Sequence, residues 1–153
     1  MENFLGDLYC LFQSLFGDRM AHYLWGLNIQ TSEYSEINQF FQFGLFSLIT
    51  AVITAVVYYF VVNATSLSKR WIWAIIAIIL AFINFGWAAY DTLWQLNNGN
   101  IDPEFGLTES NCYGFAFANF IVTVIFFVLI SGIIKRFSSN GKHTPWPSIW
   151  PKH

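Results

Sequence analysis

The fold is decided by residues 71–95, WIWAIIAIILAFINFGWAAYDTLWQ. Small and polar residues recur in this stretch at spacings of three and four, which places them on one face of a helix. That face holds Ala74, Ala77, Ala81, Asn84, Ala88, Asp91 and Gln95. The other faces are mostly Ile, Leu, Phe and Trp. The pattern predicts a membrane-spanning helix that packs its small and polar stripe against protein.

The composition of the 153-residue chain is that of a membrane protein. Hydrophobic residues make up 56% and aromatic residues 20%. Only 10% of the residues are charged, against roughly 25% in soluble domains. A soluble domain of this size cannot hide so much apolar surface, whereas a protein that faces lipid need not. We therefore expect an all-α integral membrane protein with no soluble domain, with the lipid bilayer as a partner and with no nucleic-acid partner.

Two other long apolar segments flank this stretch. The expected spans cover residues of about 37–62, 71–95 and 112–134 within a transmembrane bundle of residues 31–136. Each flanking span carries a stripe of its own. The first stripe holds Gly44, Ser47, Ala51, Thr54 and Tyr58, and the last holds Cys112, Ala116, Asn119 and Thr123. We expect Thr31 or Ser32 to cap the first spanning helix.

Residues 1–30 are expected to form an amphipathic helical segment before the spans. In a helix over residues 3–17, one broad face would hold Phe4, Leu5, Leu8, Tyr9, Leu11, Phe12, Leu15 and Phe16. Asp18 is expected to cap a short second helix that ends near Gly26. Asp18 and Arg19 argue against a fourth span. An interfacial helix lying along the membrane fits this pattern, and so does a helix docked on the bundle or on a neighbouring subunit.

The basic residues predict the orientation of the chain. The 63–70 turn and the C-terminal tail hold Lys69, Arg70, Lys135, Arg136, Lys142 and Lys152, whereas the N-terminal segment and the 97–111 loop hold only Arg19. This bias predicts an outer N-terminus and a cytoplasmic C-terminus, in an integral protein that we expect in a bacterial inner membrane. The sequon at Asn63 would then face the cytoplasm and stay unglycosylated.

Residues 137–153 form a basic tail that proline keeps from being helical. It also carries Trp146 and Trp150. An extended peptide that docks on a cytoplasmic protein partner fits this composition. A segment anchored by its tryptophans on the lipid headgroups fits equally well.

Catalysis has little support in the sequence. The three histidines lie outside the spans, and metalloprotease, nucleophile-elbow and phosphate-loop motifs are absent. Asp18 and His22, four residues apart, are expected to form a surface ion pair. Cys10 and Cys112 either form one disulfide or remain unpaired thiols, and we favour the second reading. We therefore expect no enzymatic activity, no catalytic residue, no metal site and no cofactor.

The three stripes supply the candidate functional residues. As pore or helix-interface residues we identify Thr50, Thr54, Asn84, Asp91, Gln95, Asn119 and Thr123. As helix-packing residues we identify Gly44, Ser47, Ala51, Ala74, Ala77, Ala81, Ala88 and Ala116. The stripes either join helices through close approach and hydrogen bonds, or line a pore inside an oligomer. A pore needs several copies, with residues 71–95 facing the oligomer axis and with Asp91 and Gln95 in a ring at its outer mouth.

The sequence thus favours a non-enzymatic, multi-pass membrane subunit. We expect a homo-oligomer that assembles through small and polar helix faces and acts as the pore, anchor or scaffold of a membrane assembly. The alternative is a membrane-perturbing effector of the holin or toxin kind, which the amphipathic N-terminal segment motivates. A small transporter or an integral-membrane enzyme is the third reading.

Overall fold

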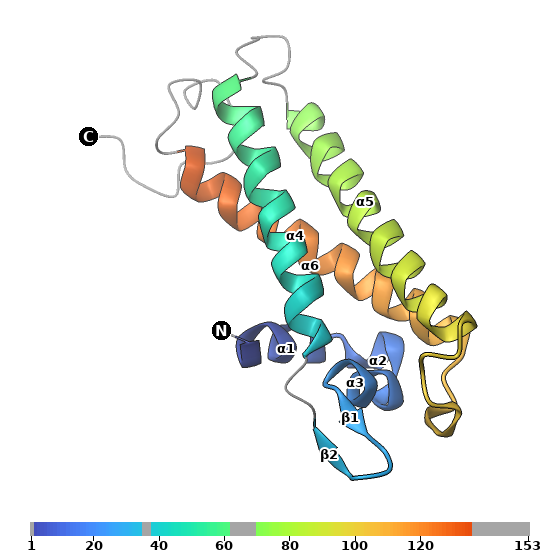
Figure 1. The fold of residues 1–153 in the computed structure, drawn as a ribbon. Coiled ribbons are helices and arrows are strands. Elements are labelled where there is room, and N and C mark those ends of the chain that lie inside the picture. The colour runs from blue at the N-terminus through green and yellow to red at the C-terminus, as the bar shows by residue number, and fades with distance from the viewer. Residues whose placement is uncertain (1, 35–37, 62–69, 136–153) are drawn as a thin grey trace.

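Three long helices dominate the computed structural model, which describes residues 2–34, 38–61 and 70–135 (Figure 1). They are α4 (Gln39–Val56), which continues as the π-helix η1 (Val57–Val61), α5 (Arg70–Asn97) and α6 (Glu109–Lys135). The stretches Gln39–Phe60, Trp71–Asn97 and Glu109–Lys135 are long and apolar enough to cross a membrane. The prediction of three long apolar helices is therefore confirmed.

The helix in the middle of the bundle is α6. It packs along both α4 and α5, which contact each other over a shorter stretch. Figure 1 shows α6 running behind α4 from the lower end of α5 to the upper end of α4. Ala116 and Ala118 are fully buried on α6, and side chains this small let neighbouring helices approach closely. Residues 71–95 thus flank the centre of the fold instead of forming it.

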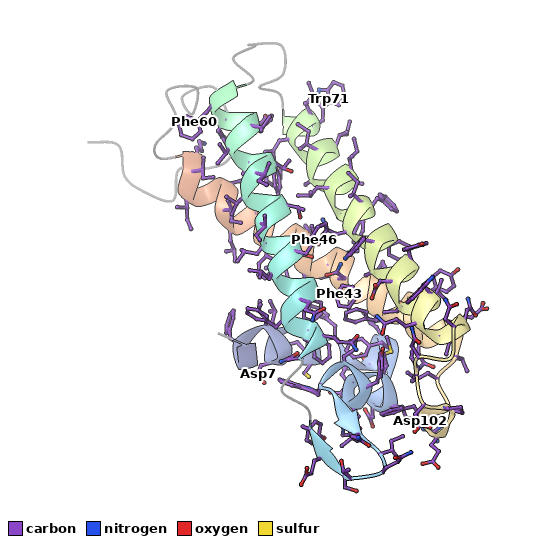
Figure 2. All side chains as sticks on the ribbon, viewed as in Figure 1. Asp7, Phe43, Phe46, Phe60, Trp71 and Asp102 are labelled. Carbon is purple, nitrogen blue, oxygen red and sulfur yellow. The ribbon has the colours of Figure 1, made fainter. Side chains whose placement is uncertain are left out.

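The outward faces of the three long helices are covered by large apolar side chains (Figure 2). The exposed ones include Phe46, Ile49, Ile53 and Phe60 on α4 and η1, Ile75, Ile79, Phe82, Ile83, Trp87, Tyr90 and Trp94 on α5, and Tyr113, Phe117, Leu129 and Ile133 on α6. Leaving such surface in water costs about 25 cal/mol per Å², a cost that lipid removes. Trp87, Tyr90 and Trp94 cluster toward one end of α5, as aromatic residues do at membrane interfaces.

Residues 2–34, here called the N-terminal cap, fold against one end of the bundle (Figure 1). The cap consists of α1 (Glu2–Cys10), α2 (Gln13–Phe16), α3 (Asp18–Leu24) and a hairpin of β1 (Leu27–Asn28) with β2 (Glu33–Tyr34). α1 packs on α4 and α6, and α2 packs on α6. This segment is therefore docked on the chain's own bundle, as one of its two predicted placements requires.

Glycine allows the cap to approach the bundle closely. A Cβ atom added at Gly114 of α6 would lie 2.1 Å from the backbone oxygen of Leu15 in the cap. A Cβ atom added at Gly44 of α4 would lie 3.1 Å from the side chain of Leu5. The first distance is far below any van der Waals contact, so only glycine fits at position 114 in this packing.

An aromatic cluster fills the space between the cap and the bundle. Phe16 and Tyr9 come from the cap, and Phe40, Phe43 and Phe115 come from α4 and α6. Phe115 lies edge-on to Phe43 at 5.0 Å and to Phe16 at 5.7 Å between ring centroids. Pairs in this geometry contribute about 0.5–1.5 kcal/mol beyond the area that they bury. The cluster therefore makes the cap part of the folded core.

The predicted single helix over residues 3–17 is wrong, because the chain turns between α1 and α2. The backbone N–H of Phe12 bonds to the oxygen of Tyr9 at 2.8 Å, which closes this turn. As a result the expected apolar face divides. Tyr9 and Phe16 are buried against the bundle, whereas Leu11 and Leu15 are exposed.

Two predicted helix caps are also wrong. The first spanning helix begins at Gln39, and the side chain of Asn38 caps it by accepting from the N–H of Phe41 at 3.3 Å. Residues 31–34 belong to the hairpin and its turn instead, and Glu33 lies in β2. The residue before α3 is Gly17, so Asp18 lies inside the helix, where its carboxylate accepts from Gln13 Nε2 at 2.7 Å.

The connection from α5 to α6 contains two turns and a short helix. After α5 ends at Asn97, the N–H of Asn100 bonds to the oxygen of Gln95 at 3.0 Å, and Gly99 takes a positive φ of 70°. The Asp102-Pro103-Glu104 turn begins the short helix η3 (Pro103–Phe105), with the Asp102 side chain accepting from the N–H of Glu104. The predictions for residues 63–69 with their sequon and for the 137–153 tail lie outside the described residues.

Candidate functional site

A buried network of polar side chains lies where α4, α5 and α6 meet. Its centre is the amide of Asn119 on α6, which is fully buried. Asn119 Oδ1 accepts from the hydroxyl of Tyr9 and from Ser47 Oγ, the latter at 3.0 Å. Asn119 Nδ2 donates to the backbone oxygen of Asn84 at 3.0 Å. One side chain therefore joins the cap, α4 and α5 to α6.

The second centre of this network is Asn84, which lies midway along the apolar stretch Trp71–Asn97. Its Nδ2 donates to Thr50 Oγ1 and to the backbone oxygen of Leu80, each at 3.1 Å. Its Oδ1 lies 3.2 Å from Ser47 Oγ and 3.4 Å from Thr50 Oγ1. Thr50 and Ser47 both belong to α4, so Asn84 bonds α5 to α4 in the middle of the bundle.

The polar atoms at the two centres of the network find their hydrogen-bond partners within the chain. Both oxygens and both nitrogens of the Asn84 and Asn119 side chains have partners within the chain. Burying an amide without partners costs several kcal/mol in an apolar medium, and these bonds remove that cost. They also fix the register of three helices, because each partner must lie at one height along its helix. The arrangement suits a structural joint between helices.

The network holds no group that ionises near neutral pH. Its one titratable member is Tyr9, and burial raises the pKa of this phenol well above its usual range, with a smaller opposite effect from the Ser47 hydroxyl. The phenol therefore remains protonated and donates to Asn119 under physiological conditions.

A smaller polar chain lies at the end of the bundle that faces the cap. The hydroxyl of Tyr23 on α3 donates to Gln95 Oε1, and Gln95 Nε2 donates to Asp91 Oδ2 at 2.5 Å. Burial raises the pKa of Tyr23, hydrogen bonding with Gln39 lowers it, and the negative charge of Asp91 raises it again. Asp91 and Gln95, expected at the mouth of a pore, thus hold the cap to α5.

The structure brings most of the predicted pore or helix-interface residues together inside one chain. Thr50, Asn84 and Asn119 belong to the central network, and Thr123 Oγ1 donates to the backbone oxygen of Asn119 at 2.8 Å. Thr54 is half-buried one turn beyond Thr50. Asp91 and Gln95 lie in the separate chain with Tyr23.

The predicted helix-packing residues also lie within the bundle. Those that are buried are Gly44, Ser47, Ala51, Ala77, Ala81, Ala88 and Ala116. Ala74, near the start of α5, is half-buried. The stripe of residues 71–95 therefore points into the chain's own bundle. This position differs from the one expected at an oligomer axis, because α6 and α4 already cover the stripe.

Sequence reasoning missed three polar side chains that the structure places at these contacts. The amphipathic pattern places Tyr9 on an apolar face and gives no role to Tyr23, but both hydroxyls bond to the bundle. Thr92 is fully buried, and its Oγ1 donates to the backbone oxygen of Ala88 at 2.7 Å. A signal existed for the tyrosines, since a buried phenol requires a hydrogen-bond partner.

The remaining predictions concern metal ligands, an ion pair and the two cysteines. Groups of three or more His, Cys, Asp or Glu side chains that could hold a metal ion do not occur among them. The predicted ion pair of Asp18 with His22 is wrong, because Asp18 bonds to Gln13 and His22 Nδ1 lies 3.0 Å from the hydroxyl of Tyr34. Both cysteines, Cys10 and Cys112, are free.

Comparison with known proteins adds no relative. No protein-family model, no curated protein and no solved structure matches this chain.

Proposed function

We propose that the protein is a non-enzymatic, multi-pass membrane subunit that serves as an anchor or scaffold of a membrane assembly. One observation carries this proposal. The polar residues of the three long helices bond to each other inside a single bundle, whereas the outward faces are bulky and apolar. A bundle of this kind is a rigid body that holds its place in lipid without exposing a reactive group.

Assembly with copies of itself or with another membrane protein uses the outward faces in this proposal. A pore lined by the stripes requires Asn84 to leave Ser47 and Thr50, and Asn119 to leave Tyr9. Opening the bundle therefore breaks the bonds that join α4 and the cap to Asn84 and Asn119. The anchor or scaffold role needs no such opening, and we favour it over the pore for this reason.

The proposed placement puts the cap at the outer side of a bacterial inner membrane and the C-terminus in the cytoplasm. The cap and the α5–α6 connection lie at the same end of the bundle (Figure 1). Among the described residues, the cap end holds Arg19 as its basic residue, and the opposite end holds Arg70 and Lys135. This distribution follows the rule that basic residues flank membrane helices on the cytoplasmic side. The amphipathic cap would then occupy the outer interface.

The alternative function is a membrane-perturbing effector. Phe4, Leu11 and Leu15 favour it, because these large side chains are exposed on α1, on the turn after it and on α2. Controlled expression in bacteria separates the two functions. An effector arrests growth and collapses the membrane potential, whereas an anchor or scaffold is tolerated at high level.

The proposal is tested by native mass spectrometry of the protein released from membranes in a mild detergent. We expect a mass above that of one chain, from further copies or a partner. Asn84→Leu is expected to leave that mass unchanged and to weaken only the bundle, because Asn84 is buried within one chain. A clean monomer from the native membrane would contradict an assembly subunit. If Asn84→Leu lowered the mass to that of one chain, the small and polar stripe of residues 71–95 would be the subunit interface instead.

A further inference from the structure

The N-terminal cap has an outward apolar side that the bundle does not cover. Phe4 is 65% exposed on α1, a helix whose other side is buried against the bundle. Leu11, the first residue after α1, is 75% exposed. Leu15 of α2 is exposed as well. Large apolar side chains that stay exposed on a small folded segment indicate a partner surface.

The cap lies beside the ends of the long helices, within the apolar part of the bundle. Leu5 packs on Gly44, which is five residues along α4 from Gln39 and hence about 7.5 Å from the start of that helix. The phenol of Tyr9 reaches still deeper, to Asn119. Helices that lie in a membrane interface bury their apolar face about 5–10 Å into the headgroup and acyl boundary. The position of α1 along α4 matches that depth.

The outward side of the cap continues into the outward face of α6. Leu15 touches Gly114 through its backbone, and the neighbouring α6 residues Tyr113 and Phe117 are about half exposed. The face of α6 is among those that we place in lipid. Ser14 of α2, also exposed, supplies a polar side chain toward the headgroups and water. A single surface can therefore run from the bundle onto the cap.

We propose that Phe4, Leu11 and Leu15 insert into the acyl-chain boundary of the outer leaflet, so that the cap binds lipid with one side and the bundle with the other. This inference rests on the membrane placement proposed above. Continuity with the face of α6 and the matching depth favour lipid over a second copy of the chain as the occupant. The cap then acts as an in-plane anchor that fixes the height of the bundle in the bilayer.

Spin labels on single cysteines in proteoliposomes of phosphatidylethanolamine and phosphatidylglycerol test this inference. Cys10→Ser removes the half-buried thiol, and Cys112 is fully buried and stays unlabelled. Labels are placed by Leu11→Cys on the proposed lipid side, by Ser14→Cys on the polar side and by Ile79→Cys on the outward face of α5. Collision with oxygen reports lipid, and collision with a water-soluble nickel chelate reports water.

We expect the label at residue 11 to collide more with oxygen and the label at residue 14 to collide more with nickel. Phe4→Cys provides a second lipid-side position if Leu11→Cys does not fold. A nickel-accessible label at residue 11 would overturn the inference, and a label shielded from both reagents would show that protein covers the face. The label at residue 79 keeps the two proposals apart. Lipid at residue 79 with water at residue 11 refutes only the in-plane anchor, whereas water at residue 79 refutes the membrane placement itself.

Discussion

Tyr9 in the cap donates a hydrogen bond to Asn119 in the middle helix of the bundle, although 110 positions separate them in the sequence. Asn119 also accepts from Ser47 on α4 and donates to the backbone of Asn84 on α5. Four helices therefore meet at one amide. The cap and the three long helices consequently form one folded unit. A substitution at Asn119 is expected to weaken the contacts of all four helices.

Tyr9→Phe is expected to destabilise the protein by about 0.5–1.5 kcal/mol, the net contribution of one hydrogen bond. The loss stays this small because Asn119 Oδ1 keeps its bond to Ser47. The measurement is the free energy of unfolding by titration with a denaturing detergent. Tyr90→Phe on the exposed face of α5 is the matched control and should change little, since Tyr90 is 68% exposed. Equal losses in both variants would contradict a special role for Tyr9.

Asn119→Leu is expected to cost more than Asn84→Leu in the same assay. The first change removes three interhelical bonds, to Tyr9, Ser47 and the backbone of Asn84. At about 0.6 kcal/mol for each bond between membrane helices, the loss is about 2 kcal/mol. Asn84→Leu removes only the interhelical bonds to Ser47 and Thr50 of α4. Both hydroxyls keep another acceptor, because Ser47 still donates to Asn119 and Thr50 still donates to the backbone oxygen of Ser47. We expect a loss of about 1 kcal/mol there, and the reverse order would show that Asn84 is the centre of the network.

The three long helices and their inward stripes follow from sequence periodicity alone. Ala81, Asn84 and Ala88 fall on one side of a helix whatever they pack against, so their shared face was predictable. What covers that face depends on how three helices cross, and the sequence of one helix contains no information about this. The sequence therefore leaves two readings of the stripe, a joint between helices or the lining of a pore in an oligomer, and the structure covers it with α6 and α4.

The cap shows a second limit of sequence reasoning. Tyr9 falls on the apolar side of its helix, and the amphipathic pattern counts it with Leu5 as lipid- or core-facing. Whether its hydroxyl meets Asn119 depends on a contact over 110 positions, which local patterns do not encode. The turn between α1 and α2 was missed for a similar reason, because residues 10–13 hold no glycine or proline to mark it.

Gly114→Ala is expected to push the cap away from α6. The added Cβ atom would lie 2.1 Å from the backbone oxygen of Leu15, and overpacking of this kind costs about 1–3 kcal/mol. The readout is alkylation of Cys112, fully buried two residues away, in a Cys10→Ser background. We expect faster alkylation than in the background protein.

Gly132→Ala is the matched control for this change, since a Cβ atom there meets nothing within 4 Å. Alkylation of Cys112 should stay slow in that variant. If Gly114→Ala were alkylated no faster than Gly132→Ala, then the close contact between the cap and α6 would not exist in the membrane.

The stability that Tyr9 contributes is expected to vanish at alkaline pH. Burial raises the pKa of this phenol in the folded protein, whereas in the unfolded chain it lies near its ordinary value of 10. Below about pH 10 both states are protonated and the contribution is complete. Above it the unfolded chain releases a proton that the folded protein retains, so unfolding becomes easier by up to about 1.4 kcal/mol per pH unit.

Tyr9→Phe lacks this group, and its loss of stability relative to the unmodified protein should therefore shrink as the pH rises from about 8 to about 11. Tyr23, whose pKa burial also raises, should behave in the same way in Tyr23→Phe. The measurement is the unfolding free energy of each variant against pH, and parallel curves for Tyr9→Phe and the unmodified protein would mean that the phenol reaches water in the folded state.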